Sequence, residues 1–152
     1  MPPLFEEIDS QDSVLGEISL RRRRIPVFGD RDIYEVKLGD EFLMSSMFVD
    51  AEEALSTLGL AAVLGDNLNV VVGGLGLGYT AVAALKDARI ADLFVVDALD
   101  AVICWHKTEL VPLGQILNAD IRNHYVLGSF FDISTAPDRR FDTGEDSNAF
   151  AA

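Results

Sequence analysis

Closely spaced glycines follow a run of valines near the middle of this 152-residue chain. The stretch from residue 69 to residue 80 reads NVVVGGLGLGYT. Its β-branched residues predict a buried strand, and its glycines allow the backbone to turn sharply into a helix that begins near Tyr79. Such a turn leaves main-chain N–H groups unpaired and gives the polar end of a ligand room to approach them. The stretch therefore predicts a nucleotide-binding loop.

The spacing of the glycines favours one class of nucleotide. Gly74, Gly76 and Gly78 form GxGxG, whereas the dinucleotide motif GxGxxG would require a glycine at Tyr79. Hydride-transfer cofactors are therefore disfavoured. A phosphate loop that began at Gly73 would require a lysine at Tyr79, and without that cation a triphosphate lacks its main counter-charge. An S-adenosyl ligand carries no phosphates and is compatible with this spacing.

Asp97 adds a carboxylate to the loop. It ends the next apolar run, LFVVD, about 20 residues further on, where a dinucleotide fold places its ribose-binding acid. An S-adenosyl ligand needs a carboxylate for its ribose hydroxyls rather than positive charge, and Asp97 could supply it. The alternative is that the glycines form only a tight connection between a strand and a helix. The valine run together with Asp97 favours the ligand site.

The segment VVGGLGLGYTAVAALKDARIADLFVVDAL resembles motifs I and II of the class I S-adenosylmethionine-dependent methyltransferase fold, in the variety found in spermidine synthases and their relatives. The upstream segment DEFLMSSMFVDAEEAL resembles the stretch that leads from their N-terminal β-region into the first helix. The resemblance covers most of residues 15–142 and implies S-adenosylmethionine or its decarboxylated form as the ligand. The ligand-binding residues that it implies are Gly74, Gly76, Gly78, Asp97, Ala98, Ser129 and Phe130.

One of these positions departs from the family pattern. In the resembling families an acidic residue follows the glycine of the third strand and holds the adenine amino group. Here Gly128 is followed by Ser129, with Phe130 able to pack on the base. A serine hydroxyl can still bond adenine, but it discriminates less, because charge-assisted hydrogen bonds are roughly twice as strong as neutral ones.

The pattern along the chain predicts an α/β protein. Residues 1–48 are expected to form an N-terminal arm, up to about Ser13, and a small antiparallel β-meander. Residues 49–142 are expected to form a partial Rossmann-like parallel sheet with flanking helices. Residues 143–152 are expected to form a disordered polar tail.

The first helix is predicted over residues 51–64, with Leu55, Leu58 and Ala62 in its buried stripe. In the resembling families this helix flanks the ligand cleft, and a polar residue at its start often faces the pocket. Glu53 is the candidate here. The alternative is an ordinary carboxylate that stabilises the helix N-terminus.

The end of the sequence departs most from the family. After Asp142 the family would continue into a fourth strand that carries acidic catalytic groups, whereas this chain ends in TGEDSNAFAA. No residue matches the acid that serves polyamine synthesis, so no catalytic residue is assigned. The first parallel strand is expected to have an open edge, covered by self-association into a dimer. A truncated or frame-shifted gene product is another explanation.

Two functions therefore remain open. The first is an S-adenosyl-dependent transferase that moves an aminopropyl or a methyl group, or the remnant of such an enzyme. The second is a non-catalytic module that retains half of the fold and oligomerises through its exposed edge.

Composition and charge favour some classes of binding partner over others. The net charge of −13 disfavours nucleic acids and anionic membranes, and it favours a cationic ligand such as a polyamine or a sulfonium. The single cysteine cannot form an internal disulfide, and no Cys/His cluster has the spacing of metal ligands. The N-terminus has no secretion signal, so a cytoplasmic location is expected.

Two clusters of chemically capable side chains are interpreted as structural. Arg21–Arg24 is the only dense basic run, and we expect its charges to offset carboxylates on neighbouring strands; a phosphate or nucleic-acid patch is the alternative. Cys104 and His106 lie on one predicted helix but do not face each other, so packing is favoured over a cysteine nucleophile.

Overall fold

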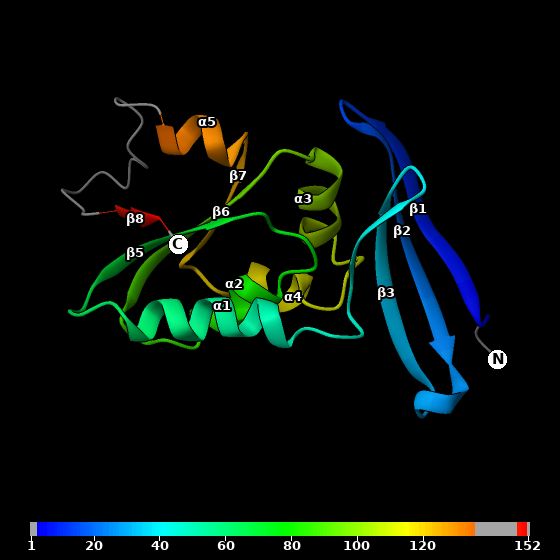
Figure 1. Ribbon diagram of the computed structural model, residues 1–152, viewed down its shortest axis with the longest axis horizontal. Coiled ribbons are helices and arrows are strands. Elements are labelled where there is room, and N and C mark those ends of the chain that lie inside the picture. The colour runs from blue at the N-terminus through cyan, green and yellow to red at the C-terminus, as the bar shows by residue number, and fades with distance from the viewer. Residues whose placement is uncertain (1–2, 136–148, 152) are drawn as a thin grey trace. The chain divides into compact units, whose positions relative to one another are not determined.

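A computed structural model describes residues 3–135 and 149–151 of the chain. The chain forms two compact units, Met1–Val49 and Asp50–Ala152, and each has its own four-stranded sheet (Figure 1). Strand pairing is antiparallel in the first sheet and parallel in the second. This confirms the predicted α/β class, with an antiparallel meander followed by a partial Rossmann-like sheet. Among the described residues, every helix is too short or too polar to cross a membrane.

The sheet of the first unit has the strand order β1-β2-β3-β4. Its elements are β1 (Phe5–Ser13), β2 (Gly16–Ile25), the 3-10 turn η1 (Pro26–Phe28), β3 (Arg31–Leu38) and β4 (Glu41–Ser45). Its most deeply buried apolar side chains, at most 2% exposed, are Ile18, Leu20, Ile33 and Val36. The small core of this unit therefore comes from the two central strands.

The segment expected to be an exposed arm is strand β1. Its sequence, FEEIDSQDS, lacks the alternation of apolar residues that indicates a strand. It pairs antiparallel with β2, which places Glu6 opposite Arg22 and Glu7 opposite Arg21. The strand is one arm of a hairpin with β2, so its stability comes from this pairing and not from a pattern within its own residues.

The four arginines of β2 each pair with a carboxylate on an adjacent strand. The ion pairs are Arg21–Glu7 (3.3 Å), Arg22–Glu6, Arg23–Glu35 (2.9 Å) and Arg24–Asp32 (2.7 Å). These contacts confirm that the basic run offsets carboxylates of the sheet. Three of the pairs lie near the surface, where such pairs contribute only about 0–1 kcal/mol each. Glu35 is buried, so Arg23 also gives a buried carboxylate its partner.

The second unit is built on a parallel sheet with the order β7-β6-β5-β8. Its elements are α1 (Asp50–Ala61), β5 (Leu68–Gly73), α2 (Tyr79–Leu85), β6 (Ile90–Asp97), α3 (Asp100–Lys107), α4 (Gly114–Ala119), β7 (Asn123–Leu127), α5 (Phe130–Thr135) and β8 (Ala149–Ala151). Helices α1 and α2 lie along one face of the sheet and α5 along the other (Figure 1). Because both faces are covered, β5 and β6 are nearly continuous apolar runs.

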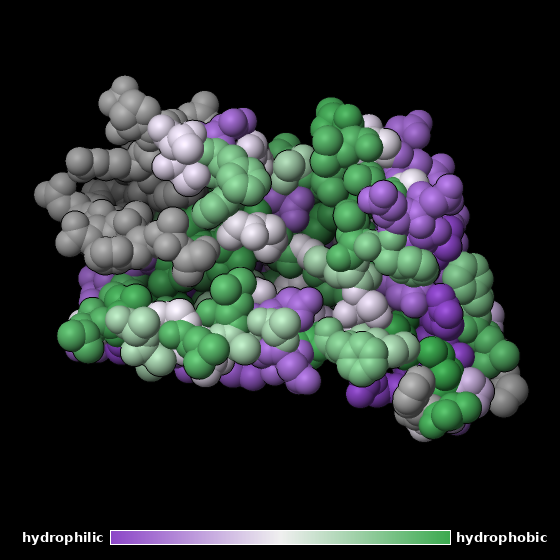
Figure 2. Space-filling view, viewed as in Figure 1, coloured by the Kyte–Doolittle hydropathy of each residue, from purple (hydrophilic) through white to green (hydrophobic). Residues whose placement is uncertain are grey.

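Helix α1 packs differently from the prediction. Leu55 and Leu58 are 57% and 70% exposed, and the buried residues of the helix are Ser56 and Leu60. The Ser56 hydroxyl donates to the carbonyl oxygen of Thr80 at 2.6 Å, which ties α1 to the first turn of α2. Apolar residues therefore reach the surface along α1 (Figure 2).

The edge of β5 that was expected to be open is partly paired by the chain itself. Strand β8 runs parallel to β5 and pairs with Asn69, Val70 and Val71. The expected polar tail thus contains a short strand, although three residues are too few to carry a sequence pattern. Residues 143–148 and 152 of that tail lie outside the described residues.

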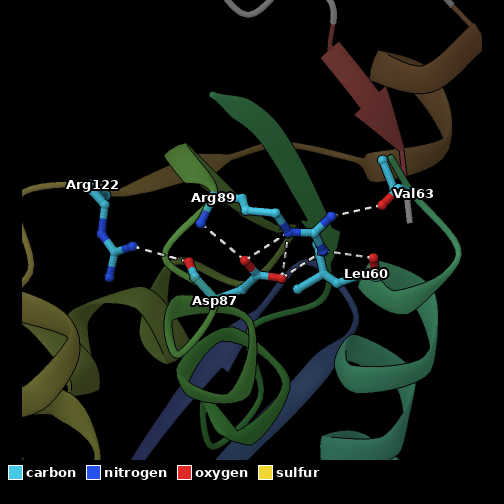
Figure 3. Close-up of polar contacts among 5 residues, drawn as sticks. All are labelled: Leu60, Val63, Asp87, Arg89 and Arg122. Carbon is cyan, nitrogen blue, oxygen red and sulfur yellow. Dashed lines mark hydrogen bonds and ion pairs between the residues drawn. The ribbon is translucent and has the colours of Figure 1, made fainter. Parts of the chain in front are cut away.

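An ion pair between an aspartate and the arginine two residues later precedes both β6 and β7. Arg89, just before β6, holds the Asp87 carboxylate and donates to the carbonyl oxygens of Leu60 and Val63, at 2.8 and 2.7 Å (Figure 3). Leu60 lies in the last turn of α1 and Val63 lies two residues beyond it, where carbonyl groups lack the partners of a continuing helix. The guanidinium therefore caps the preceding helix while it pairs with its own turn.

Arg122 repeats this arrangement before β7. It pairs with Asp120 and donates to the carbonyl oxygens of Leu85 and Asp87, at 2.7 and 3.3 Å, at the end of α2. The Arg122–Asp87 bond is also drawn in Figure 3. Each Asp-x-Arg sequence thus links a strand entry to the C-terminus of an earlier helix.

We expect Arg122→Gln to lower the free energy of unfolding by about 1–2 kcal/mol, because the Leu85 carbonyl loses its donor and Asp120 loses its partner. Urea unfolding measures this change. Lys86→Gln is the matched control, since Lys86 is exposed and its loss removes the same charge. Equal losses in the two variants would contradict the capping role.

The difference between wild type and Arg122→Gln should shrink in acid. Hydrogen bonds from Arg122 hold the pKa of Asp120 below its ordinary value of 3.8. A lowered pKa in the folded state stabilises the protein above the unfolded value, and this contribution is lost as the pH falls through the folded value. Unfolding curves measured between neutral pH and pH values below 3.8 test the trend.

Candidate functional site

The predicted ligand-binding residues lie where three parallel strands end. The glycine loop leaves β5, Asp97 and Ala98 end and follow β6, and Ser129 and Phe130 follow β7. Because β5, β6 and β7 are neighbours with parallel direction, their carboxyl ends meet at one edge of the sheet. The fold therefore brings together all the residues that the sequence pattern selected.

Asp97 connects the three strand ends. Its Oδ2 accepts a hydrogen bond from the Leu75 N–H at 2.9 Å, and its Oδ1 accepts one from the Leu99 N–H at 2.8 Å. Its main-chain carbonyl oxygen accepts a bond from the Gly128 N–H at 2.9 Å. The Asp97 residue is only partly buried, and each carboxylate oxygen retains a lone pair. The carboxylate is thus fixed in orientation and can still accept further hydrogen bonds.

The amides of the glycine loop divide into two groups. The Gly74 N–H donates to the Val96 carbonyl at 2.7 Å, and the Gly78 N–H donates to the Leu75 carbonyl at 2.9 Å. Within the part of the chain that the structure describes, the N–H groups of Gly76 and Leu77 donate to no partner. The amides of Gly74 and Leu75 therefore tie the loop to β6, and that of Gly78 closes a turn within the loop.

Sequence analysis missed the contact that His106 makes with this loop. The residue lies on α3 with none of its surface exposed, and its Nε2 is 2.8 Å from the Gly76 carbonyl oxygen. Burial lowers the pKa of His106. The predicted packing role therefore holds for His106, whereas Cys104 is exposed. The available signal was a histidine on an otherwise apolar helix face after the second parallel strand.

Ser129 and Phe130 have structural contacts of their own. The Ser129 hydroxyl accepts a hydrogen bond from the Asp132 N–H at 3.3 Å in the first turn of α5. The Phe130 ring lies against Gly73, where a Cβ atom would come within 2.8 Å of the ring. The same ring packs against the buried cluster of Val71, Phe94, Val96 and Ile133. Phe130 therefore forms a fixed apolar wall beside the end of β5.

Glu53 and possible metal ligands are further candidates for parts of this site. Glu53 lies in the first turn of α1, as predicted, and is partly buried. Among the described residues, no three His, Cys, Asp or Glu side chains are grouped in a way that could hold a metal ion.

We expect Gly78→Ala to destabilise the protein more than Gly74→Ala. Both glycines have positive φ angles, +90° and +99°, which cost an alanine about 1–2 kcal/mol. A Cβ at Gly78 would lie 2.9 Å from side-chain atoms of His106 and Leu117, whereas a Cβ at Gly74 meets nothing within 4 Å. Urea unfolding of both variants isolates the packing contribution, of about 1–3 kcal/mol. Equal losses would show that the ring contact does not constrain the loop.

Comparisons with known proteins locate this fold. No protein-family model matches the sequence, and no curated protein matches it. The structure is similar to that of spermidine synthase from Thermotoga maritima, with a TM-score of 0.64 and 18% identity over 81% of this chain and 40% of that chain. It is equally similar to a spermidine synthase in complex with the transition state analogue AdoDATO, with a TM-score of 0.64 and 18% identity over 80% of this chain and 39% of that one.

The chain spans about 40% of the length of the spermidine synthase structures that it matches. At 18% identity the similarity concerns architecture, which many functions can share. The matched region includes about four-fifths of this chain. The protein described here has a spermidine synthase-like fold.

Proposed function

We propose that this chain binds an S-adenosyl ligand, either S-adenosylmethionine or its decarboxylated form, at the carboxyl ends of β5, β6 and β7. The observation that carries the proposal is the Asp97 carboxylate, which two main-chain N–H groups hold beside the glycine loop. One of the similar spermidine synthase structures contains the transition state analogue AdoDATO. The similarity in fold and this fixed carboxylate together support an adenosyl site.

The chemistry of a ribose suits Asp97. A ribose has two adjacent hydroxyl groups, and the lone pairs left on Oδ1 and Oδ2 can accept one hydrogen bond from each. The two bonds from the protein hold the carboxylate in place, so less conformational entropy is lost when a ligand binds. In this proposal Gly76 and Leu77 provide N–H donors for the polar end of the ligand.

The adenine base would lie near Ala98 and Phe130 in this proposal. Ala98 is exposed and Phe130 is partly buried, so both offer apolar surface. The Ser129 hydroxyl already accepts one bond, and its own O–H remains able to donate to a ring nitrogen of adenine. Such a contact selects adenine less strongly than a carboxylate on the amino group would.

Group transfer from a sulfonium depends mainly on positioning, since the reacting carbon is already activated. The acidic composition of the chain favours a cationic ligand and a cationic acceptor such as a polyamine. We therefore propose a transferase of an aminopropyl or a methyl group as the activity of this fold. No residue is assigned as its catalytic acid or base.

Calorimetric titration tests the binding proposal directly. Wild type is titrated with S-adenosylmethionine, its decarboxylated form, methylthioadenosine and NAD. We expect the adenosyl ligands to bind and NAD to remain silent, because the glycine spacing does not suit a dinucleotide. Binding of NAD alone, or silence toward every ligand, would contradict the proposal.

A second titration tests the role of Asp97. Methylthioadenosine and its 2′-deoxy analogue are compared on wild type, Asp97→Asn and the control Asp100→Asn, whose side chain is exposed three residues further on. Removing the 2′-hydroxyl should weaken binding about tenfold in wild type and in the control, as expected for a bond to a charged group. The Asp97→Asn variant should bind both compounds equally weakly. Unchanged discrimination in that variant would exclude Asp97 as the ribose acceptor.

A second candidate function is that of an oligomerising module, and one observation supports it. Strand β8 is an edge strand that pairs with β5 over only three residues, and edge strands are templates for pairing with another chain. Size-exclusion chromatography with light scattering should then give the mass of a dimer at micromolar concentration. A monomer that binds adenosyl ligands would rule out this candidate.

A further inference from the structure

His106 contacts the glycine loop through a bond whose direction is determined by chemistry. Its Nε2 lies 2.8 Å from the Gly76 carbonyl oxygen, which can only accept a hydrogen bond. Nε2 must therefore carry the proton. Nδ1 is then a bare acceptor, and in the described residues it is buried without a hydrogen-bond partner. The neutral tautomer with its proton on Nε2 satisfies this contact without placing a proton on the unpartnered Nδ1.

The ring is also held on its other sides. A Cβ at Gly78 would lie 2.9 Å from its Cε1 atom, so only glycine leaves room for it there. The Tyr125 ring lies on another side, with its centroid 6.2 Å away. The main-chain carbonyl of His106 accepts a bond from Asn118 Nδ2 at 2.9 Å, which ties this part of α3 to α4. The imidazole therefore has little freedom to turn away from the loop.

This bond also determines the direction of a neighbouring amide. The Gly76 carbonyl and the Leu77 N–H belong to one trans peptide, in which the two groups point in opposite directions. When His106 draws the carbonyl toward the core, the Leu77 N–H points away from the ring. That N–H is one of the two loop donors without a partner in the described chain. Gly76 itself has a φ of +53°, and a glycine peptide rotates easily unless it is held.

We propose that His106 is a positioning residue that locks the Gly76–Leu77 peptide with its N–H donor directed toward the adenosyl ligand. The proposal rests on the function proposed above for the same site. His106 does not touch the ligand and acts through the loop. Without its bond, the Gly76 carbonyl loses its only anchor among the described side chains, and the peptide samples other orientations.

The charge state of the ring gives the stability of the fold a dependence on pH. Burial lowers the pKa of His106, while the bond to Gly76 and the negative charge of Asp97 act in the opposite direction. The other titratable group beside the ring, Tyr125, has its pKa raised by burial to about 12 and stays neutral. The unfolded chain therefore binds a proton near pH 6.5 that the folded chain resists, so stability falls as the pH drops below this value.

Two amide variants separate the positioning role from simple packing. His106→Gln places an N–H₂ group near the position of Nε2, whereas the side chain of His106→Asn is one carbon shorter and falls short of Gly76. Both variants carry the same functional group, and neither titrates. The Gln variant should therefore restore the loop, and the Asn variant should not.

Hydrogen exchange reads the state of the loop without any ligand. The amides of Leu75 and Gly78 donate to Asp97 and to the Leu75 carbonyl, so their exchange rates report whether the loop is closed. We expect both rates, relative to β6 amides, to rise at least about tenfold in His106→Asn, the loss of about one hydrogen bond, and to stay near wild type in His106→Gln. Equal rates in the three proteins would overturn the proposal.

Nitrogen NMR of the wild type provides a check that no variant can disturb. The chain has two histidines, so the His106 signal is identified by its absence in His106→Gln. We expect a neutral ring with the proton on Nε2 down to a pH below 6.5. A proton on Nδ1, or a charged ring at neutral pH, would overturn the proposal.

Affinity for methylthioadenosine completes the test. It should fall about tenfold in His106→Asn and remain near wild type in His106→Gln. Equal affinities in the two variants would contradict positioning through Gly76. If wild type binds no adenosyl ligand while the exchange rates still differ as expected, the proposed function fails and the loop anchor stands.

Discussion

The carboxylate of Asp97 is the constraint on which the candidate site depends. One side chain accepts the Leu75 and Leu99 amides, and the same residue's carbonyl accepts the Gly128 amide. Main-chain groups at the ends of buried strands need partners when water cannot reach them. Asp97 provides these partners for three separate segments. The glycine loop, the entry to α3 and the end of β7 are therefore fixed relative to one another by a single residue.

The glycines of the loop are required at their positions for different physical reasons. Gly73 leaves space for the Phe130 ring, and Gly78 leaves space for the imidazole of His106. A Cβ at Gly74 would have no atom within 4 Å, so glycine is required there only for the positive φ of +99°. A loop with this composition can therefore look like a ligand motif and still be largely shaped by packing. What favours a ligand is that the amides of Gly76 and Leu77 have no partner among the described residues, whereas those of Gly74, Leu75 and Gly78 do.

The scaffold that carries the site is held by ion pairs placed at corresponding points. Arg89 and Arg122 occupy the last position before β6 and β7, and each caps the end of an earlier helix. Strand β8 adds a fourth parallel strand beside β5. These contacts fix where each strand enters the sheet, and hence where its carboxyl end delivers the site residues.

The sequence alone determined the elements whose signal is local: the apolar runs of β5 and β6, the glycine turn between β5 and α2, and the carboxylate that follows β6. Tertiary structure decided what depends on contacts between distant residues. Strand β1 forms by pairing along β2, and α1 buries Ser56 rather than Leu55 because it lies close against α2. The anchor from His106 to Gly76 joins positions 30 residues apart, and no periodicity or spacing encodes such a bond.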